Sequence, residues 1–461
     1  MPNISQSTNV ISLETFQPSR ILQPEEFESY IGKEKVEQLK KTASLIEGKG
    51  WTNVNSTLSG GGVAEMLQSA VPLAMGLGID AKWHVIRGNH NFFQVTKKFH
   101  NMLQGLDLPI SLEEIFDAYL NTIDENARNT FIASDLIIIH DPQPAAMVMN
   151  GLIFGNILWR CHIDTSAPNE IVWRFLLPYI NQCAGAVFTI PEFIGPGLLV
   201  PLYQIYPCIN PIAEKNRQRS TQEALSVLSS LFHDDNIDPE RPIIAAVSRY
   251  DIHKNQATII EAFKAYKKDH HPDPAPYLIF LGNTASDDPE GEEMLEKLRN
   301  QAGEDPDIKF WVNVENNDQV VGSLVKVADF FIHISTREGF GLVVSEAMWQ
   351  GTPVIGSNVG GIIKQVIVGQ TGFLVDPMDV DAIVGKMHYF FENPEAGRKM
   401  GENGREHVRS HFLITELVHR YLQLIQFYSG MTFEVPPFRI DNLSYSELLN
   451  VMRPKPFFLN K

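Results

Sequence analysis

Short apolar runs alternate with helical patterns along the first half of the chain. The runs lie at residues 51–57, 81–88, 135–141, 152–164 and 185–190. They are apolar on both faces rather than at alternate positions, which is typical of strands in a parallel sheet that helices cover on both sides. This pattern predicts a doubly wound, Rossmann-like α/β domain.

The same alternation returns in the second half, after a proline-rich passage at 193–211. The apolar runs there lie at 242–249, 277–282, 308–314, 328–335, 352–357 and 372–375. We therefore expect a second doubly wound, Rossmann-like domain, with helical sequence at 384–428. The expected boundaries are 1–207 for the first domain, with 1–20 loose, 208–410 for the second, and 411–461 for a helix that returns to the first domain plus an unassigned tail. Ligands are expected in a cleft across which the two domains face each other.

Composition and charge narrow the class of partner. The 461 residues carry a formal net charge of −17, and the pI is about 5.3. So acidic a chain, without a marked basic stripe, argues against nucleic acid or an anionic membrane surface as a partner, and small molecules are expected instead. The three cysteines, Cys161, Cys183 and Cys208, show no metal-ligand spacing and indicate a reducing compartment.

Neither a signal-peptide pattern nor an apolar stretch of the ~20 residues that a membrane span needs is present in the sequence. We therefore expect a cytoplasmic protein. Whether two copies form a homodimer is left open.

The segment 335–351, STREGFGLVVSEAMWQG, carries the strongest functional signal. Its apolar residues recur at helical spacing, so Glu338 and Glu346 frame the N-terminus of a predicted helix. Such an end binds anions, and the neighbouring glycines let a ligand approach the backbone. Glu338 could hold sugar hydroxyls and Glu346 a ribose; alternatively, the first acid only stabilises the helix dipole and Glu346 is solvated. The donor-side candidates from this segment are Glu338, Gly339, Phe340, Gly341 and Glu346.

A second donor-side candidate is the segment 248–255, SRYDIHKN, which follows a buried strand. Arg249 and Lys254 could clamp a diphosphate at that strand end. The alternative is a surface loop in which Asp251 pairs with a neighbouring cation.

Polar residues also end strands of the first domain. Gly61 and Gly62 belong to a glycine run between a strand and a helix, which allows close approach to phosphates or a sugar or forms only a tight turn. His140 and Asp141 end one strand, and Arg160, His162 and Asp164 end the next. These residues could contact the donor sugar or a hydroxyl-rich acceptor; alternatively, the aspartates form turns. A metal site is a third interpretation, but we expect no required metal because cations and helix dipoles already supply charge stabilisation.

Together these segments resemble the trehalose glycosyltransferring synthases, retaining glycosyltransferases of the GT-B type, with the retaining trehalose phosphorylases as close relatives. The resemblance runs from about residue 28 to about residue 428. It departs from the family's usual pattern at His333-Ile334, at Asn210 and at Ile252-His253. The segments that carry it include VNSTLSGGGVAEML, IIIHDPQPAA, WRCHIDTSAPN, INPIAEKN and REGFGLVVSEAMWQGTPVIGSNVGG.

The resemblance implies transfer of glucose from ADP-, UDP- or GDP-glucose to the anomeric hydroxyl of glucose, giving α,α-trehalose reversibly and with no cofactor. It implies that Arg249, Lys254 and Glu338 are catalytic and that Glu346 binds the ribose. His140 would touch the donor sugar, and the acceptor candidates are Arg160, His162 and Asp164. Two alternatives are a trehalose phosphorylase that uses inorganic phosphate and a non-catalytic sensor of sugar nucleotides.

Overall fold

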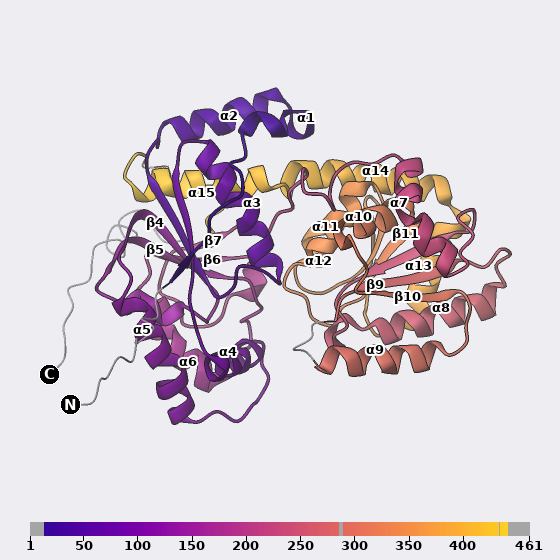
Figure 1. Ribbon diagram of the computed structural model, residues 1–461, viewed down its shortest axis with the longest axis horizontal. Helices are drawn as coiled ribbons and strands as arrows, with labels where there is room; N and C mark the ends of the chain where they lie inside the picture. The colour runs from indigo at the N-terminus through magenta and orange to yellow at the C-terminus, as the bar shows by residue number, and fades with distance from the viewer. Residues whose placement is uncertain (1–12, 285–288, 433, 441–461) are drawn as a thin grey trace, which may run out of the picture. The chain divides into compact units, whose positions relative to one another are not determined.

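The computed structural model describes residues 13–284, 289–432 and 434–440. Its internal contacts divide the chain into two compact units (Figure 1). The first unit comprises the chain up to Pro207 together with the part from Leu417 onward, and the second is Cys208–Glu416. The chain thus returns to the first unit at 416/417, a little after the position at 411 that the sequence suggested. Each unit has its own core of buried apolar side chains.

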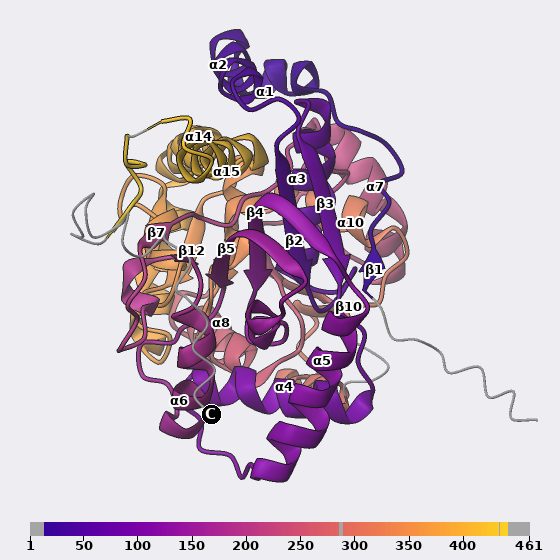
Figure 2. The same cartoon turned by 90° about the vertical axis from the view of Figure 1, so that its left-hand side faces the viewer.

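The first unit is a seven-stranded sheet in the order β1-β3-β2-β4-β5-β6-β7. All neighbouring strands are parallel except β1, which pairs antiparallel with β3. Helices cover both faces, with α2, α3 and α15 on one and α4, α5 and α6 on the other (Figure 2). The strands are Glu14–Thr15 (β1), Gly50–Asn55 (β2), Asp80–Val85 (β3), Ile132–His140 (β4), Ile153–Cys161 (β5), Gly185–Phe188 (β6) and Leu202–Gln204 (β7). The main helices are Lys33–Ser44 (α2), Gly62–Gly76 (α3), His90–Leu103 (α4), Asn121–Arg128 (α5), Glu170–Ile180 (α6) and Ile414–Tyr428 (α15).

The second unit is a six-stranded, fully parallel sheet in the order β10-β9-β8-β11-β12-β13. The strands are Ile243–Val247 (β8), Tyr277–Gly282 (β9), Ile308–Val312 (β10), Phe330–His333 (β11), Val354–Ser357 (β12) and Gly372–Val375 (β13). The helices are Thr221–Asp234 (α7), Gln256–His270 (α8), Pro289–Ala302 (α9), Asn317–Val327 (α10), Leu342–Gln350 (α11), Ile362–Gln365 (α12), Val380–Glu392 (α13) and Pro394–His411 (α14). The two doubly wound sheets confirm the predicted fold class.

Each sheet has a point at which the strand order reverses. In the first unit it lies between β2 and β4, and in the second between β8 and β11. Loops that leave the two central strands diverge there, so the carboxyl ends of these strands border a crevice where α/β proteins bind ligands. His140 ends β4 at the first of these positions, and the loops that carry Lys254 and Glu338 follow β8 and β11 at the second.

The chain enters the first unit within α15. Tyr421 packs against Trp51 of β2 with ring centroids 5.0 Å apart, and Gln426 donates to the carbonyl of Thr42 in α2 at 2.9 Å. Beyond α15, the described part of the tail runs along β7: Gln204 N donates to Phe438 O, and Ile440 N to Leu202 O, both at 2.9 Å. The described part of the tail that the sequence left unassigned therefore lies along a sheet edge, and residues 441–461 lie outside the described chain.

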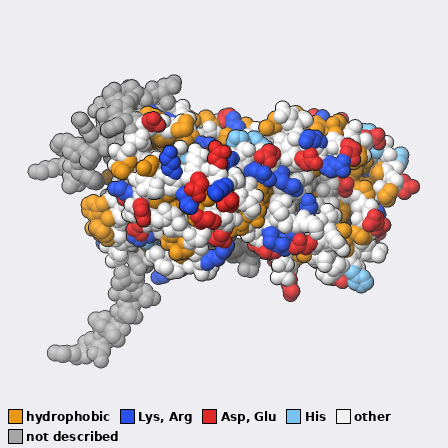
Figure 3. All heavy atoms as spheres, turned by 90° about the horizontal axis from the view of Figure 1, so that it is seen from above, with side chains coloured by type: hydrophobic (Ala, Val, Ile, Leu, Met, Phe, Trp, Pro, Cys, Tyr) orange, Lys and Arg blue, Asp and Glu red, His pale blue; other side chains and the backbone are white. Residues whose placement is uncertain are grey.

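Two surface properties bear on the expected partners. Acidic and basic side chains are interspersed over the face shown in Figure 3 and form no basic stripe there. Among the described residues, none of the helices combines the length and apolar character needed to cross a membrane.

Candidate active site

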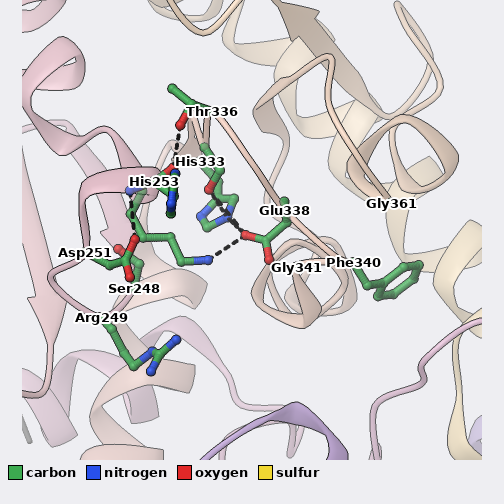
Figure 4. Close-up of polar contacts among 12 residues, drawn as sticks. Ser248, Arg249, Asp251, His253, His333, Thr336, Glu338, Phe340, Gly341 and Gly361 are labelled. Atoms are coloured by element: carbon green, nitrogen blue, oxygen red, sulfur yellow. Dashed lines mark hydrogen bonds and ion pairs between the residues drawn. The ribbon is translucent and has the colours of Figure 1, made fainter. Parts of the chain in front are cut away.

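Lys254 and Glu338 form an ion pair at the switch point of the second sheet. Lys254 ends the short 3-10 helix Ile252–Lys254 after β8, and Glu338 lies in the loop between β11 and α11. Because β8 and β11 are neighbouring parallel strands, their carboxyl ends bring the two side chains together. Lys254 Nζ donates to Glu338 Oε2 at 2.7 Å, and the side chains are only 17% and 12% exposed (Figure 4).

Two further donors reach the same carboxylate oxygen. His333 Nε2 lies 2.8 Å and Ser335 Oγ 3.2 Å from Glu338 Oε2. Burial raises the pKa of Glu338, but the Lys254 charge and the hydrogen bonds from His333 and Lys254 outweigh it and hold that pKa well below its usual range. Burial lowers the pKa of His333, with the carboxylate opposing the shift. Glu338 is therefore ionised, and His333 is a neutral imidazole that donates from Nε2.

Close backbone packing fixes the loop that carries Glu338. Gly360 has a φ of +53°, and a Cβ there would lie 1.7 Å from the carbonyl oxygen of Glu338. Gly361 N donates to Gly339 O at 3.1 Å. Because α11 begins only after Gly341, which has a φ of +78°, Glu338 precedes the helix rather than lying in its first turn. The loop thus presents the carboxylate beside the first N–H groups of the helix.

Arg249 lies on the loop after β8 but is not part of this cluster. Its side chain is exposed, and Figure 4 shows its guanidinium apart from the Lys254–Glu338 pair. Asp251 accepts a hydrogen bond from His253 N at 2.7 Å and so caps the short helix. Lys254 is engaged with Glu338 and not with Asp251, which disfavours the interpretation of 248–255 as a surface loop with a local ion pair.

Glu346 also has a cationic partner. It lies within α11, is 5% exposed, and sits 2.6 Å from Nζ of Lys215. It is therefore buried rather than solvated. Sequence reasoning missed Lys215, which lies in INPIAEKN far from α11 along the chain; only the folded topology brings the two together.

A chain of neutral side chains crosses the switch point of the first unit. His140 Nε2 lies 3.0 Å from Asn53 Oδ1, and His140 Nδ1 lies 3.0 Å from His162 Nε2. Burial and the Arg160 charge lower the pKa of His140 to about 3 and that of His162 well below its usual value. With Asn53 Oδ1 as the acceptor, His140 donates from Nε2, so its Nδ1 accepts from His162 Nε2. Both nitrogens of His140 are thereby occupied within the unit.

Asp141, which directly follows His140, has an unusual backbone conformation. Its φ is +62°, which is uncommon for a residue other than glycine and typical of functional sites. Its Oδ1 accepts from His162 N at 2.9 Å, and its carbonyl accepts from Trp159 Nε1 at 3.0 Å. Burial raises the pKa of Asp141 to about 7, with the His162 hydrogen bond and the Arg160 charge acting in the opposite direction. A turn-forming aspartate was the alternative that the sequence left open here, and the fold adds a buried carboxyl with a raised pKa.

The remaining first-unit candidates differ in where they point. Arg160 is fully buried and donates to the carbonyls of Phe188 and Ile205, so it ties neighbouring strands together rather than reaching an acceptor. Asp164 accepts from Ser166 N at 2.9 Å in a local turn. Gly61 and Gly62 are exposed at the N-terminus of α3. Among the described residues, no group of three or more His, Cys, Asp or Glu is arranged to hold a metal ion.

Two Rossmann-like units, with a carboxylate–cation cluster beside a helix N-terminus in the second, have the architecture of a GT-B glycosyltransferase. Two family models match the chain: "Trehalose synthase, N-terminal domain" over residues 53–195, and "Glycosyl transferases group 1" over residues 230–407.

The relatives identify the family within this class. A trehalose synthase of Pyrococcus horikoshii is 40% identical over 88% of this chain and 96% of its own length, and one of Rubrobacter xylanophilus is 38% identical over 87% and 95%. A trehalose phosphorylase of Grifola frondosa is 27% identical over 77% of this chain and 54% of its own. The chain belongs to the trehalose synthase family and is a trehalose-related, retaining glycosyltransferase. This assignment as an enzyme disfavours the sensor alternative.

Solved structures share the fold at low identity. A sucrose-phosphate synthase from Thermosynechococcus elongatus superposes with a TM-score of 0.62 at 18% identity, covering 83% of this chain and all of its own. An α,α-trehalose 6-phosphate synthase from Burkholderia multivorans gives 0.65 at 13% identity, covering 83% and 99%.

Acid should destabilise the fold through His140. A histidine of the unfolded chain titrates near ~6.5, whereas the folded pKa is about 3. Because the folded value is the lower one, this contribution to stability is complete above about pH 6.5 and is lost as the pH falls from there toward 3. The free energy of unfolding should therefore fall as the pH is lowered. In His140→Gln this slope should be less steep than in the parent by up to ~1.4 kcal/mol per pH unit.

Urea unfolding at pH 7.5, 6.5 and 5.5 measures this slope. The exposed His90→Gln is the matched control and should follow the parent protein. An unchanged slope in His140→Gln would show that the buried histidine does not remain neutral as the acid is added.

Proposed function

We propose that the protein transfers glucose from a nucleoside diphosphate glucose to the anomeric hydroxyl of glucose, forming α,α-trehalose reversibly. The observation that carries this proposal is the Lys254–Glu338 cluster at the switch point of the second sheet. The 40% identity to a trehalose synthase supports the choice of product.

Charge on the departing nucleoside diphosphate is the main problem that the site must solve. Lys254 carries three N–H donors, of which one engages Glu338. The others are available to phosphate oxygens, together with the exposed Arg249 and the first N–H groups of α11. Such preorganised donors stabilise charge as the glycosidic bond breaks. With charge stabilisation supplied in this way, we expect turnover without a divalent cation or another cofactor.

Glu338 holds hydroxyls of the transferred glucose. Its Oε2 is occupied by three donors, whereas Oε1 has no hydrogen-bond partner among the described residues. A carboxylate used in this way binds the sugar and is not the nucleophile, so no covalent glucosyl-enzyme intermediate is expected. The departing phosphate takes the proton from the acceptor hydroxyl.

We also propose sugar contacts for residues of the first unit. His140 has both ring nitrogens engaged, so we reassign the sugar contact expected of it to the half-buried His162. We assign Asp141 to the acceptor in place of Arg160, because Asp141 lies at the carboxyl end of β4 while Arg160 faces the interior.

Product identification tests this proposal most simply. The protein is incubated with glucose and ADP-, UDP- or GDP-glucose, with and without EDTA, and products are identified by the NMR signals of their anomeric protons. We expect α,α-trehalose from at least one donor and no loss of rate with EDTA. Release of glucose 1-phosphate from trehalose and inorganic phosphate, without synthesis from any nucleotide, would establish a phosphorylase instead.

Glu346 distinguishes a nucleotide from phosphate as the leaving group. A buried carboxylate on α11 suits a ribose diol, which only a nucleotide supplies. Glu346→Ala should weaken the affinity for the nucleoside diphosphate by about 10- to 150-fold, the equivalent of ~1.5–3 kcal/mol for a charge-assisted hydrogen bond, and spare the affinity for trehalose.

Calorimetric titration with nucleoside diphosphates and with trehalose measures both affinities. Lys215→Met serves as a control, because it removes the charge partner of Glu346 while keeping the carboxylate. Equal nucleotide affinity in Glu346→Ala and the parent would remove the ribose role.

A further inference from the structure

The Glu338 carboxylate is held from one side only. Its Oε2 accepts from Lys254 Nζ at 2.7 Å, from His333 Nε2 at 2.8 Å and from Ser335 Oγ at 3.2 Å. Figure 4 shows the second oxygen turned away from these donors. A carboxylate with one oxygen so fully occupied can turn little about its terminal bond, and the direction of the other oxygen is thereby set.

The three donors differ in how firmly they are placed. Lys254 ends in a flexible chain, and in the proposed reaction it also contacts the diphosphate. Ser335 has the longest contact with the carboxylate. His333 is the last residue of β11, is 4% exposed, and lies in register with Gly356 of β12 in the middle of the sheet. It is the one rigid, planar donor in the cluster.

We propose that His333 is a positioning residue for glucose transfer, because its Nε2–H fixes Glu338 Oε2 and so aims Oε1 at a hydroxyl of the transferred glucose. This inference rests on the proposed function, in which Glu338 holds that sugar. His333 itself touches neither the donor nor the acceptor.

Neutrality is what suits His333 to this role. Lys254 and Glu338 already balance each other in charge, so a neutral donor orients the carboxylate without weakening its attraction for Lys254. Burial keeps the imidazole neutral, as its lowered pKa indicates. The charged groups that face it are Glu338 and Lys254. A second cation at this position would compete with Lys254 for the same oxygen.

The side chain of residue 333 can be varied while the rest of the cluster is kept. Glutamine carries an amide N–H of similar reach, leucine carries none, and asparagine carries one on a side chain that is too short. We expect His333→Gln to keep kcat/KM within about threefold of the parent. His333→Leu and His333→Asn should lose about 10- to 150-fold in kcat/KM, the range for a hydrogen bond to a charged group.

The penalty should depend on the sugar and not on the nucleotide. The affinity for the free nucleoside diphosphate, which lacks glucose, should be the same in all three variants. A series of donors, each lacking one hydroxyl of the glucose, tests this dependence. The loss in kcat/KM caused by His333→Leu should shrink toward unity for the donor that lacks the hydroxyl held by Glu338. A residue with only a structural role would impair all donors equally.

Two further variants show whether a negative result concerns the role of His333 or the proposed function itself. His407→Leu removes a half-buried histidine of α14 that does not contact Glu338, and it should match the parent in kcat/KM. Glu338→Gln tests the function on which the inference rests.

The combined results decide between the inference and its premise. If Glu338→Gln is impaired while His333→Leu and His333→Asn are not, the positioning role is wrong and the proposed function stands. If Glu338→Gln keeps full activity, the proposed function fails as well. If His333→Leu loses the same factor in kcat/KM with every deoxygenated donor and also has a lowered Tm, the loss is structural and the positioning role is wrong.

Discussion

The ion pair between Lys254 and Glu338 is the interaction on which the chemistry proposed for the second unit depends. The two residues are 84 positions apart in sequence and meet only because β8 and β11 are adjacent at the point where the strand order reverses. Removing one partner of such a shielded pair leaves an uncompensated charge, at a typical cost of ~3–5 kcal/mol. The loop that carries Glu338 therefore needs both groups for its stability. In the proposed site Lys254 binds the diphosphate of the donor and Glu338 binds its glucose.

The two units differ in the charge of their buried polar side chains. At the second switch point, cations face carboxylates in two pairs, Lys254 with Glu338 and Lys215 with Glu346. At the first, burial keeps His140 and His162 neutral and raises the pKa of Asp141. The charged switch point suits a diphosphate, whose negative charge grows in the proposed reaction, and the neutral switch point suits the hydroxyls of a sugar. At each switch point, backbone strain or close packing fixes a loop, at Asp141 and at Gly360.

Periodicity predicted most of the fold and some of the site. Continuous apolar runs identified both parallel sheets, and the spacing of Glu338 and Glu346 around a glycine turn identified the helix end. The pairing of side chains could not be predicted, because Lys215 and Lys254 meet their partners, Glu346 and Glu338, only when distant segments assemble. The surroundings of Arg160 could not be predicted for a similar reason: a cation at a strand end resembles a ligand contact until the carbonyls of Phe188 and Ile205 are seen to accept from it. The roles of the individual residues in binding and catalysis remain predictions.

A double-mutant cycle on the central ion pair tests the account most directly. Lys254→Ala, Glu338→Gln and the combination of both are compared by kcat/KM for glucose transfer, with release of nucleoside diphosphate as the readout. If the two groups act as one unit on the same donor, the combined loss should fall short of the sum of the single losses by about 0.5–3 kcal/mol in activation free energy. Strictly additive losses would mean that Lys254 and Glu338 act independently, and would contradict the account.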